Sequence, residues 1–442
     1  MNRQNVLTSV LAGERLCDNY PSSSGGQVKA QLPGSCRGQR ASIALTESTL
    51  SRHLMLIGGT GSGKSNTIYT LIKQLKHGMT TDDVMIIFDT KGDYYKHFAT
   101  NQDLVIGNSK DFRGISQKWN IYREILSDGA DWQDIESNAH EIALGMFADT
   151  IEKNSSNPFF PMAAQDVFAT LLLRYIREGL NDASKRNLRW NNRSLKMILD
   201  TLTIEVLNIL FMEPEFQSVL NYVGATDNPQ GLVVIAEMQN ITRQIFRGAF
   251  AEDGRFSMRN FVRQKGGRTL FIEYDLSLGA ISTPIYRLLV DLALKEALSR
   301  QKASGNVYLI CDEFKLLPLL QHIEDAVNFG RGLGVKVIAG LQSIQQLTQV
   351  YGEERGRNIL AGFSSIFAFK PNDFDTCKYI SDLYGSNYLY DQFRGTGTSV
   401  VGQERTGKTV EDWEIRQLHT GEAIVGVDLQ SPYVFSFDLF RG

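Results

Sequence analysis

Short apolar runs alternate with stretches of helical periodicity along most of the chain. His53–Gly58 (HLMLIG) and Val84–Asp89 (VMIIFD) are of strand length, and such runs are typical of strands buried on both faces of a parallel sheet. The first is followed by apolar residues at helical spacing that end at a glycine: Ile68, Leu71, Ile72, Leu75 and Gly78. This pattern predicts a strand, a loop and a helix over residues 53–78.

The same alternation returns after residue 262 in the runs RTLFIEYDL, NVYLICDE, VKVIAGLQ and SSIFAFK, which are separated by helical patterns. The closing segment AIVGVDLQSPYVFSF predicts two more strands around Ser431–Pro432, as an edge hairpin. Between 116 and 262 helical periodicity dominates. Alternating strands and helices indicate an α/β fold with a mostly parallel twisted sheet. We expect an irregular N-terminal extension with a short strand or two (1–44), an α/β domain (45–115 and 263–442) and an inserted all-α domain (116–262).

Charge, cysteine spacing and hydropathy argue against a strongly basic nucleic-acid-binding protein, a cysteine metal site and a transmembrane protein. The chain has 46 Lys and Arg against 49 Asp and Glu, so composition does not indicate a basic nucleic-acid-binding surface, and any such surface must be local. Cys17, Cys36, Cys311 and Cys377 show no metal-ligand spacing and indicate free thiols in a reducing cytoplasm. No apolar run reaches the length of a transmembrane helix. We therefore expect a cytoplasmic protein, or one that partners recruit to the inner membrane.

Two segments match the phosphate-binding pattern G-x-x-x-x-G-K-[ST]: GGTGSGKS at 58–65 and GQERTGKT at 402–409. A working P-loop lies between a buried strand and a helix whose positive end faces the phosphates. Only the first has that setting. We expect Lys64 to reach the β and γ phosphates of ATP and Ser65 to ligate Mg²⁺, with the loop completed by Gly58, Gly59, Thr60, Gly61, Ser62, Gly63 and Asn66. The alternative is a glycine-rich turn without a ligand.

The second match lacks a convincing preceding strand and has none of the additional glycines. Its Glu404 would repel a phosphate. Asp428, at the end of a later strand, resembles a metal-binding acid but is not followed by a glutamate. We interpret 402–409 as a mobile loop and the match as accidental.

A P-loop enzyme also needs an acid at the end of a neighbouring strand for the metal, and usually a second carboxylate for the attacking water. VYLICDE supplies Asp312 for the metal and Glu313 as the candidate general base. Gln342 follows another buried strand and can contact the γ phosphate or its water. The alternatives are helix capping by Glu313 and by Gln342 with Ser343.

Two basic features remain open. Arg331 lies between glycines in NFGRGLGVKV, where it can act on a neighbouring subunit's nucleotide as an arginine finger or simply be a solvated surface residue. The run Lys185–Lys196 (KRNLRWNNRSLK), with Trp190 inside it, can contact phosphates and stack on a base. Its alternative is a solvated loop between helices.

These motifs together resemble the type IV coupling proteins of conjugation and secretion (VirD4, TraD and TraG-like), within the FtsK/HerA superfamily. The resemblance runs in order through HLMLIGGTGSGKS, IIFDTKGDYY, WNIY, NPFFPMAAQDVF and VYLICDEF, and is most specific in Gly330–Phe369. It implies a RecA-like motor domain carrying an all-α domain, with Lys64 and Ser65 as the Walker A pair, Asp312 and Glu313 as the Walker B pair, Gln342 as the glutamine motif and Arg331 as the arginine acting in trans.

The resemblance further implies a homo-hexamer that hydrolyses ATP between subunits and passes DNA, usually single-stranded and bound to a relaxase, or effector proteins, towards type IV secretion components. One departure is that such proteins normally begin with transmembrane helices, which are not recognisable here. This is a naturally soluble member, a truncated form, or a relative serving another DNA process. The alternatives to a secretion motor are a cytosolic FtsK/HerA-type pump in repair or defence and an ATP-switched substrate receptor.

Overall fold

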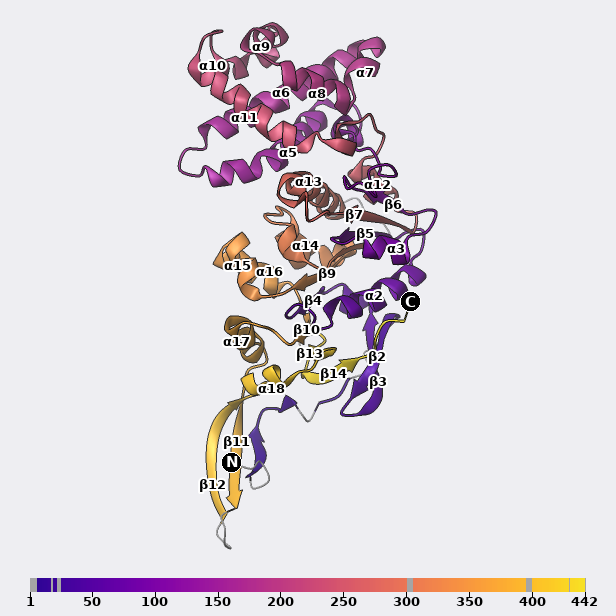
Figure 1. Cartoon of the computed structure of the whole chain (residues 1–442), viewed down its shortest axis with the longest axis vertical. Coiled ribbons are helices and arrows are strands. Elements are labelled where there is room, and N and C mark those ends of the chain that lie inside the picture. Colours follow the sequence, from indigo (N-terminus) through magenta and orange to yellow (C-terminus); the bar gives the residue numbers. More distant parts are fainter. Residues whose placement is uncertain are drawn as a thin grey trace. The chain divides into compact units, whose positions relative to one another are not determined.

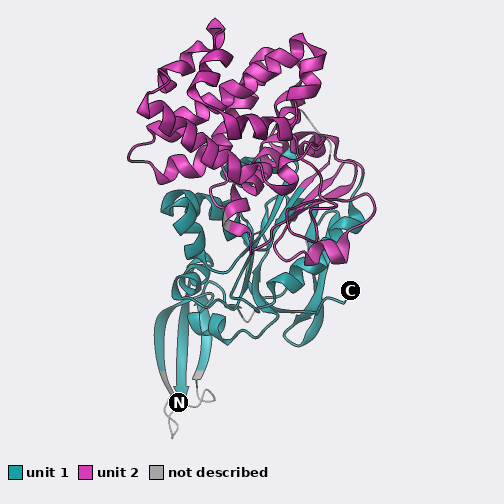
Figure 2. Ribbon diagram, turned by 45° about the horizontal axis from the view of Figure 1, so that its top comes forward, with its two compact units in different colours: residues 1–80, 308–316, 324–442 teal, residues 81–307, 317–323 magenta. Residues whose placement is uncertain are grey.

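The structure is a computed structural model of the 442-residue chain, and it describes residues 6–16, 19–21, 25–299, 305–394, 400–428 and 430–441. Its internal contacts divide the chain into two compact units (Figure 2). Unit 1 comprises residues 1–80, 308–316 and 324–442, and unit 2 comprises residues 81–307 and 317–323. We describe each unit separately.

Unit 1 contains a sheet with parallel strands next to antiparallel ones. Its strand order is β3 (Gln39–Thr46), β2 (Val28–Cys36), β14 (Tyr433–Phe437), β13 (Glu422–Gly426), β10 (Ser365–Phe369), β4 (Leu54–Ile57), β9 (Val335–Leu341) and β8 (Val307–Cys311). β4 lies parallel to both β10 and β9. All four residues of β4 are buried, as expected for a strand covered on both faces.

The first and last segments of the chain differ from the sequence prediction. β13 and β14 form the predicted antiparallel hairpin, but they do not lie at the edge, because β14 pairs with β2 and β2 with β3. Residues 1–44, predicted to be irregular with a short strand or two, therefore supply β2 and most of β3, which are regular strands of this sheet. Leu32, Cys36 and Ile43 are buried, and these apolar positions recur at the two-residue period of a strand.

A second, three-stranded antiparallel sheet in unit 1 has the order β1 (Val6–Ala12), β11 (Ser386–Arg394) and β12 (Val400–Lys408). Figure 1 labels β11 and β12 of this sheet, which lie side by side as long strands. The helices of unit 1 are α1 (Glu47–Leu50), α2 (Lys64–Gly78), α14 (Ile323–Phe329), α15 (Ile344–Tyr351), α16 (Glu353–Ala361), α17 (Phe374–Leu383) and α18 (Asp412–Gln417), with 3-10 turns at Phe314–Leu316 and Gly330–Leu333.

Unit 2 combines three parallel strands with many helices. The strands are β5 (Val84–Asp89), β7 (Arg268–Glu273) and β6 (Leu104–Ile106), with β7 between the other two. The helices are α3 (Asp93–Phe98), α4 (Ile121–Ile125), α5 (Trp132–Lys153), α6 (Phe159–Asn181), α7 (Ala183–Arg189), α8 (Asn192–Thr201), α9 (Ile204–Leu210), α10 (Leu220–Val223), α11 (Pro229–Ile245), α12 (Met258–Gln264) and α13 (Gly279–Ala297), with 3-10 turns at Leu126–Asp128, Pro214–Val219 and Gly248–Ala251.

Helix α6 is the central helix of the helical part of unit 2. It contacts α5, α7 and α11, and Figure 1 shows these helices grouped together. Val167, Phe168, Leu171, Leu172 and Ile176 are fully buried. A helix that is apolar over so much of its circumference must be surrounded by other elements, which explains why α6 lies inside the bundle.

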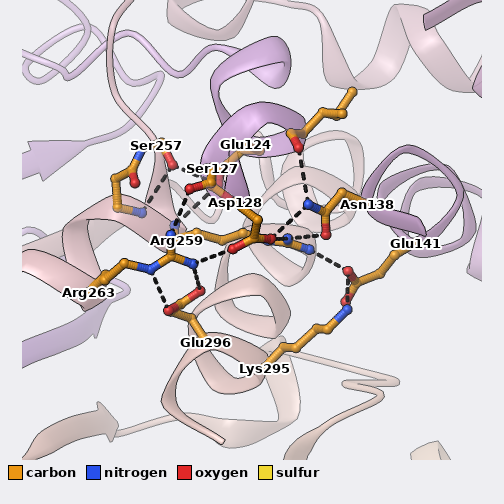
Figure 3. A network of polar contacts seen from close by, with 12 residues as sticks. Glu124, Ser127, Asp128, Asn138, Glu141, Ser257, Arg259, Arg263, Lys295 and Glu296 are labelled. Atoms are coloured by element: carbon orange, nitrogen blue, oxygen red, sulfur yellow. Dashed lines mark hydrogen bonds and ion pairs between the residues drawn. The ribbon is translucent and has the colours of Figure 1, made fainter. Parts of the chain in front are cut away.

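A network of charged side chains joins α5, α12 and α13 in unit 2 (Figure 3). Arg259, which is 3% exposed, donates to Asn138 and Glu141. Glu141 also pairs with Lys295 and lies 3.6 Å from the Nε2 atom of His322. The fully buried Glu124 accepts hydrogen bonds from the Ser257 hydroxyl and the first amides of α12. The network supplies partners for charges that are costly to bury alone.

Cys36, Cys311 and Cys377 are buried free thiols, as the sequence predicted, whereas Cys17 lies outside the described residues. Within the described ranges, no helix combines the length and apolar character needed to cross a bilayer.

Candidate nucleotide-binding site

The loop at residues 58–63 leaves β4 and leads directly into α2, the arrangement that the sequence predicted. Gly63 is the N-cap residue of α2 and has a φ of 117°, a conformation that residues with a side chain rarely adopt. No side chain caps this end of α2. Because the first amides of a helix have no partner within it, the start of α2 can bind an anion.

Lys64 is buried, and its ammonium group lies beneath the loop. The Nζ atom donates to the carbonyl oxygens of Gly58 at 2.6 Å and Gly59 at 3.2 Å. A buried ammonium is costly unless hydrogen bonds compensate for lost water. The loop carbonyls provide that compensation and hold the Lys64 charge next to the loop.

Ser65 and Asp312 are 247 residues apart in sequence, yet their side chains are in contact. The Ser65 hydroxyl donates to the Oδ2 atom of Asp312 at 2.6 Å. Asp312 directly follows β8, and β9 passes close to its backbone at Gly340, where an added Cβ would lie 2.1 Å from the Asp312 carbonyl oxygen. The pairing of strands thus brings together the two oxygen ligands predicted for Mg²⁺.

Glu313 and Gln342 form a second contact in the same unit. The Gln342 Nε2 atom donates to the Oε2 atom of Glu313 at 2.7 Å. The other oxygen, Oε1, is buried and has no hydrogen-bond partner within the described part of the chain. Burial raises the pKa of Glu313, which the Gln342 hydrogen bond and the Lys64 charge only partly oppose. A carboxylate with a free oxygen and a raised pKa is suited to accepting a proton.

Two of the predicted residues have other surroundings. Arg331 is exposed on the 3-10 turn Gly330–Leu333 and forms no hydrogen bond or ion pair with the Lys64 loop among the described residues of unit 1. The carboxamide of Asn66 contacts the C-terminal segment. It donates to the Asp438 carbonyl at 2.8 Å and accepts from the Phe440 amide at 2.6 Å. Its side chain thus anchors that segment to α2.

Asn372 was not identified from the sequence. It follows β10, and its carboxamide is so close to Gly59 that a Cβ there would lie 2.5 Å from Nδ2. The available signal was its position, since it is a polar residue three positions after the end of a strand that pairs with β4. The same reasoning identified Gln342.

The second P-loop match forms a strand, so the interpretation as a mobile loop is wrong. Residues 402–408 belong to β12 and pair with β11, and the Nζ atom of Lys408 lies 2.8 Å from Asp382. Extended, paired backbone cannot turn successive amides towards one phosphate, because they alternate in direction. The physical requirement for a P-loop is therefore met at 58–65 and not at 402–409.

Comparison with known proteins gives several related matches. Residues 37–426 match the family of type IV secretion-system coupling protein DNA-binding domains. The coupling protein TraD of Escherichia coli is 23% identical over 371 residues, covering 81% of this chain and 47% of TraD. The coupling protein VirD4 of Bartonella quintana is 22% identical over 288 residues, covering 61% of this chain and 43% of VirD4. The chain thus spans about half the length of these relatives.

Solved structures of the conjugative coupling protein TrwB share the fold. An unbound form has a TM-score of 0.76 at 20% identity, with 98% of this chain and 94% of that chain covered. TrwB in complex with ADP and Mg²⁺ has a TM-score of 0.72 at 18% identity, covering 100% and 97%. The predicted α/β fold class is confirmed. Because the family match covers most of the sequence, the chain belongs to the type IV secretion-system coupling proteins.

Proposed function

We propose that unit 1 binds and hydrolyses ATP and that the chain couples this reaction to the movement of DNA, or of protein attached to DNA, through a type IV secretion system. The observation that carries the proposal is the contact between Ser65 and Asp312 beside the buried ammonium of Lys64. It joins two motifs far apart in sequence whose residue types suit one reaction.

The residues present fit ATP and Mg²⁺. The loop from Gly58 to Asn66 and the start of α2 provide amides for the phosphates, and Lys64 provides a positive charge. The Ser65 hydroxyl and the Asp312 carboxylate are oxygen donors of the kind that Mg²⁺ prefers. When bound, Mg²⁺ would neutralise charge on the phosphates as the γ phosphoryl group leaves.

Glu313 is the candidate general base. Its free Oε1 atom can accept a hydrogen bond from the attacking water and then its proton, while Gln342 fixes the other oxygen. Gln342 would thus have two roles. Its amide orients Glu313, and the same amide can lose or change its hydrogen bonds when the γ phosphate leaves. The contact supports a coupling of hydrolysis to the position of β9.

Relatives support the finer parts of the proposal. The matching family is described as a DNA-binding domain, and one TrwB structure contains ADP and Mg²⁺. We propose that this chain acts on single-stranded DNA with a relaxase or effector protein, as a homo-hexamer with type IV secretion components. The exposed position of Arg331 agrees with a role in trans at a neighbouring subunit's nucleotide.

The decisive test compares the two P-loop matches. Lys64→Ala should reduce ATP hydrolysis, measured with and without single-stranded DNA, by about 10²-fold or more, because the charge beside the β and γ phosphates is lost. Lys408→Ala is the matched control and should leave the rate within about twofold, since Lys408 pairs with Asp382 on the surface. Equal losses in both variants would contradict the assignment of the site.

The role of Arg331 needs a mixing experiment. Arg331→Ala alone should lower the DNA-stimulated rate by about 10³-fold if the guanidinium acts at the transition state. Mixing Arg331→Ala with Lys64→Ala protein should restore part of the activity, because a mixed ring contains interfaces with an intact Lys64 and an intact Arg331. An unchanged rate in Arg331→Ala alone would leave Arg331 as a surface residue.

A DNA pump outside secretion is the second candidate. The repair helicase HerA of Sulfolobus acidocaldarius is 33% identical over 82 residues, which cover 19% of this chain. That match is short, whereas the coupling-protein family match runs through residues 37–426. Transfer of a plasmid in cells carrying Lys64→Ala distinguishes them, because a secretion motor is required for transfer and a repair pump is not.

A further inference from the structure

Unit 2 contains a surface cavity of about 410 Å³ at the basic run Lys185–Lys196. Its volume lies in the range typical of small-molecule sites. Residues of α4, α7 and α12 line it, together with Leu126 and with Trp190, the C-cap residue of α7: Tyr122, Arg123, Leu126, Arg186, Asn187, Trp190 and Asn260. The run is not a loop, because it forms α7 and the start of α8.

Two buried asparagines hold together the segments that carry the lining residues of this cavity. Asn120 donates from Nδ2 to the Trp190 carbonyl at 3.1 Å and caps α4. Asn192 accepts from the Ile121 amide at 3.1 Å and donates to the Trp119 carbonyl at 2.8 Å. These reciprocal bonds join two segments about 70 residues apart. The cavity is therefore a preformed feature of the fold, which lowers the cost of ordering it around a ligand.

The two arginines of the cavity have no acidic partner within the described residues. Arg123 is exposed and in no ion pair, and Arg186 makes a hydrogen bond from Nε to the Gly179 carbonyl. Most other arginines of unit 2 are paired with carboxylates: Arg174, Arg177, Arg189, Arg243, Arg259, Arg263 and Arg287. Guanidinium groups that line a cavity without a carboxylate indicate an anionic ligand, and their planar fork suits phosphate.

Trp190 gives the cavity an aromatic wall. Its indole nitrogen donates to the Tyr175 carbonyl at 3.0 Å, and the guanidinium of Arg186 lies 5.1 Å from the centre of its ring. The carboxamides of Asn187 and Asn260 complete the polar lining. No acidic residue occurs between Lys185 and Lys196. Arginine, an aromatic ring and amides are the groups that proteins use for nucleotides in single strands.

We infer that this cavity binds one nucleotide unit of a single-stranded nucleic acid, with Arg123 and Arg186 on the phosphate and Trp190, Asn187 and Asn260 beside the base. The inference rests on the proposed action on DNA and adds the residues that contact it. An acidic peptide would use the two arginines but would have no need of the carboxamides and the indole, which is why we favour a nucleotide.

The test uses the full chain and a fluorescent oligothymidylate of roughly twenty nucleotides, a length that exceeds one binding unit. Arg123→Ala/Arg186→Ala should weaken binding by about 10- to 100-fold and reduce the slope of log K against log salt by about 1.4, the value for two contacts with a single strand. Lys196→Ala/Arg243→Ala is the matched control. It removes the same charge from unit 2, but both cations pair with Asp200 outside the cavity.

Equal weakening in both double variants would overturn the inference, since it would show only the effect of net charge. Unchanged binding in Arg123→Ala/Arg186→Ala would overturn it too and would point to an acidic protein partner. Competition by free dTMP supports the nucleotide site with a mononucleotide as its source, whereas competition only by unlabelled strand supports a polynucleotide. Thermal unfolding confirms that each variant is folded. ATP hydrolysis without DNA should be unchanged in Arg123→Ala/Arg186→Ala. A wrong assignment of the cavity would therefore not be confused with a wrong assignment of the ATP site, which the Lys64→Ala variant tests.

Discussion

Glu313 in unit 1 and Glu141 in unit 2 are both substantially buried, yet their surroundings differ. Burial raises the pKa of Glu141, but the His322 hydrogen bond and the charges of Arg259 and Lys295 outweigh it and hold that pKa at about 2. Glu313 has a neutral amide on one oxygen and no partner on the other within the described part of the chain, and its pKa is raised. The fully paired carboxylate stabilises structure, and the incompletely paired one is available for chemistry.

The largest expected effect is on hydrolysis. Glu313→Gln keeps the shape of the side chain but cannot accept a proton, so the rate should fall by about 10²- to 10⁴-fold. Stability should be unchanged or slightly higher, because a carboxylate with a raised pKa opposes folding when it is ionised. Single-turnover hydrolysis and retention of labelled ATP measure this.

The exposed Glu354 on α16 provides the control as Glu354→Gln. A motor should retain ATP and stop moving DNA in the Glu313→Gln variant. If that variant still hydrolyses ATP at the normal rate, Glu313 is not the base. If it binds ATP without hydrolysing it and still binds its DNA or protein substrate as the native chain does, the protein is an ATP-switched receptor.

Glu141→Gln should have the opposite effect, lowering stability while leaving ATP hydrolysis intact. It leaves Arg259, which is 3% exposed, with only the longer 3.5 Å ion pair to Asp128 within the described residues, and breaking a buried pair in this way costs up to about 3–5 kcal/mol. We expect a lower midpoint for unfolding of unit 2 in urea, with hydrolysis per folded molecule retained. Glu136→Gln, at an exposed position of the same helix, should be neutral.

The contact between Glu141 and Arg259 also predicts how the stability of the chain depends on pH. The folded pKa of Glu141, about 2, lies below its ordinary value of 4.5. The stabilisation is therefore complete above about pH 4.5 and is lost as the pH falls towards 2. The difference in stability between the native chain and Glu141→Gln should shrink over that interval. A difference that stays constant down to pH 3 would mean that Glu141 acts through packing and not through charge.

The smallest expected effect is on stability, at Glu273. It tests whether the pairing of a buried glutamate, and not the unit in which it lies, decides the direction of its pKa shift. Glu273 lies in unit 2, at the end of β7, but burial and the nearby Asp275 and Asp89 raise its pKa to about 7. Its ionisation opposes folding, so stability is lost as the pH rises from about 4.5 through 7. Glu273→Gln should therefore stabilise the chain by about 1–2 kcal/mol at pH 8 after solvent screening is considered, with no difference at pH 4.5. Urea unfolding at both pH values tests this, and stabilisation of equal size at pH 4.5 would contradict it.

The sequence predicted those parts of the molecule in which local pattern and burial agree. β4, β5 and β9 are largely apolar and buried along their whole length, and the loop before α2 has glycine where a left-handed conformation is required. Strands β2 and β3 were predicted only as a short strand or two without position, because alternating positions in a polar segment such as Lys29–Cys36 give a weak signal until the partner strand is known. β12 was misjudged for the same reason, since it obtains its hydrogen bonds from β11.

The contacts of the candidate site depended on strand pairing. Nothing near Ser65 in the sequence indicates that its hydroxyl meets Asp312, and the use of Asn66 by the C-terminal segment depends on residues more than 370 positions away. The residue types could be predicted from motifs. Their partners could not, because the order of strands in a sheet decides which strand ends are neighbours.

The close approach of Gly340 to the Asp312 carbonyl limits how the site can respond to its nucleotide. Gly340 lies near the end of β9, and Gln342 directly follows that strand. The backbones of Gly340 and Asp312 therefore have no room to move closer together. Gly340→Ala, ordinarily a mild replacement, would place a methyl group 2.1 Å from the Asp312 carbonyl oxygen. The ends of β8 and β9 would have to separate, which would displace Asp312, Glu313 and Gln342 together.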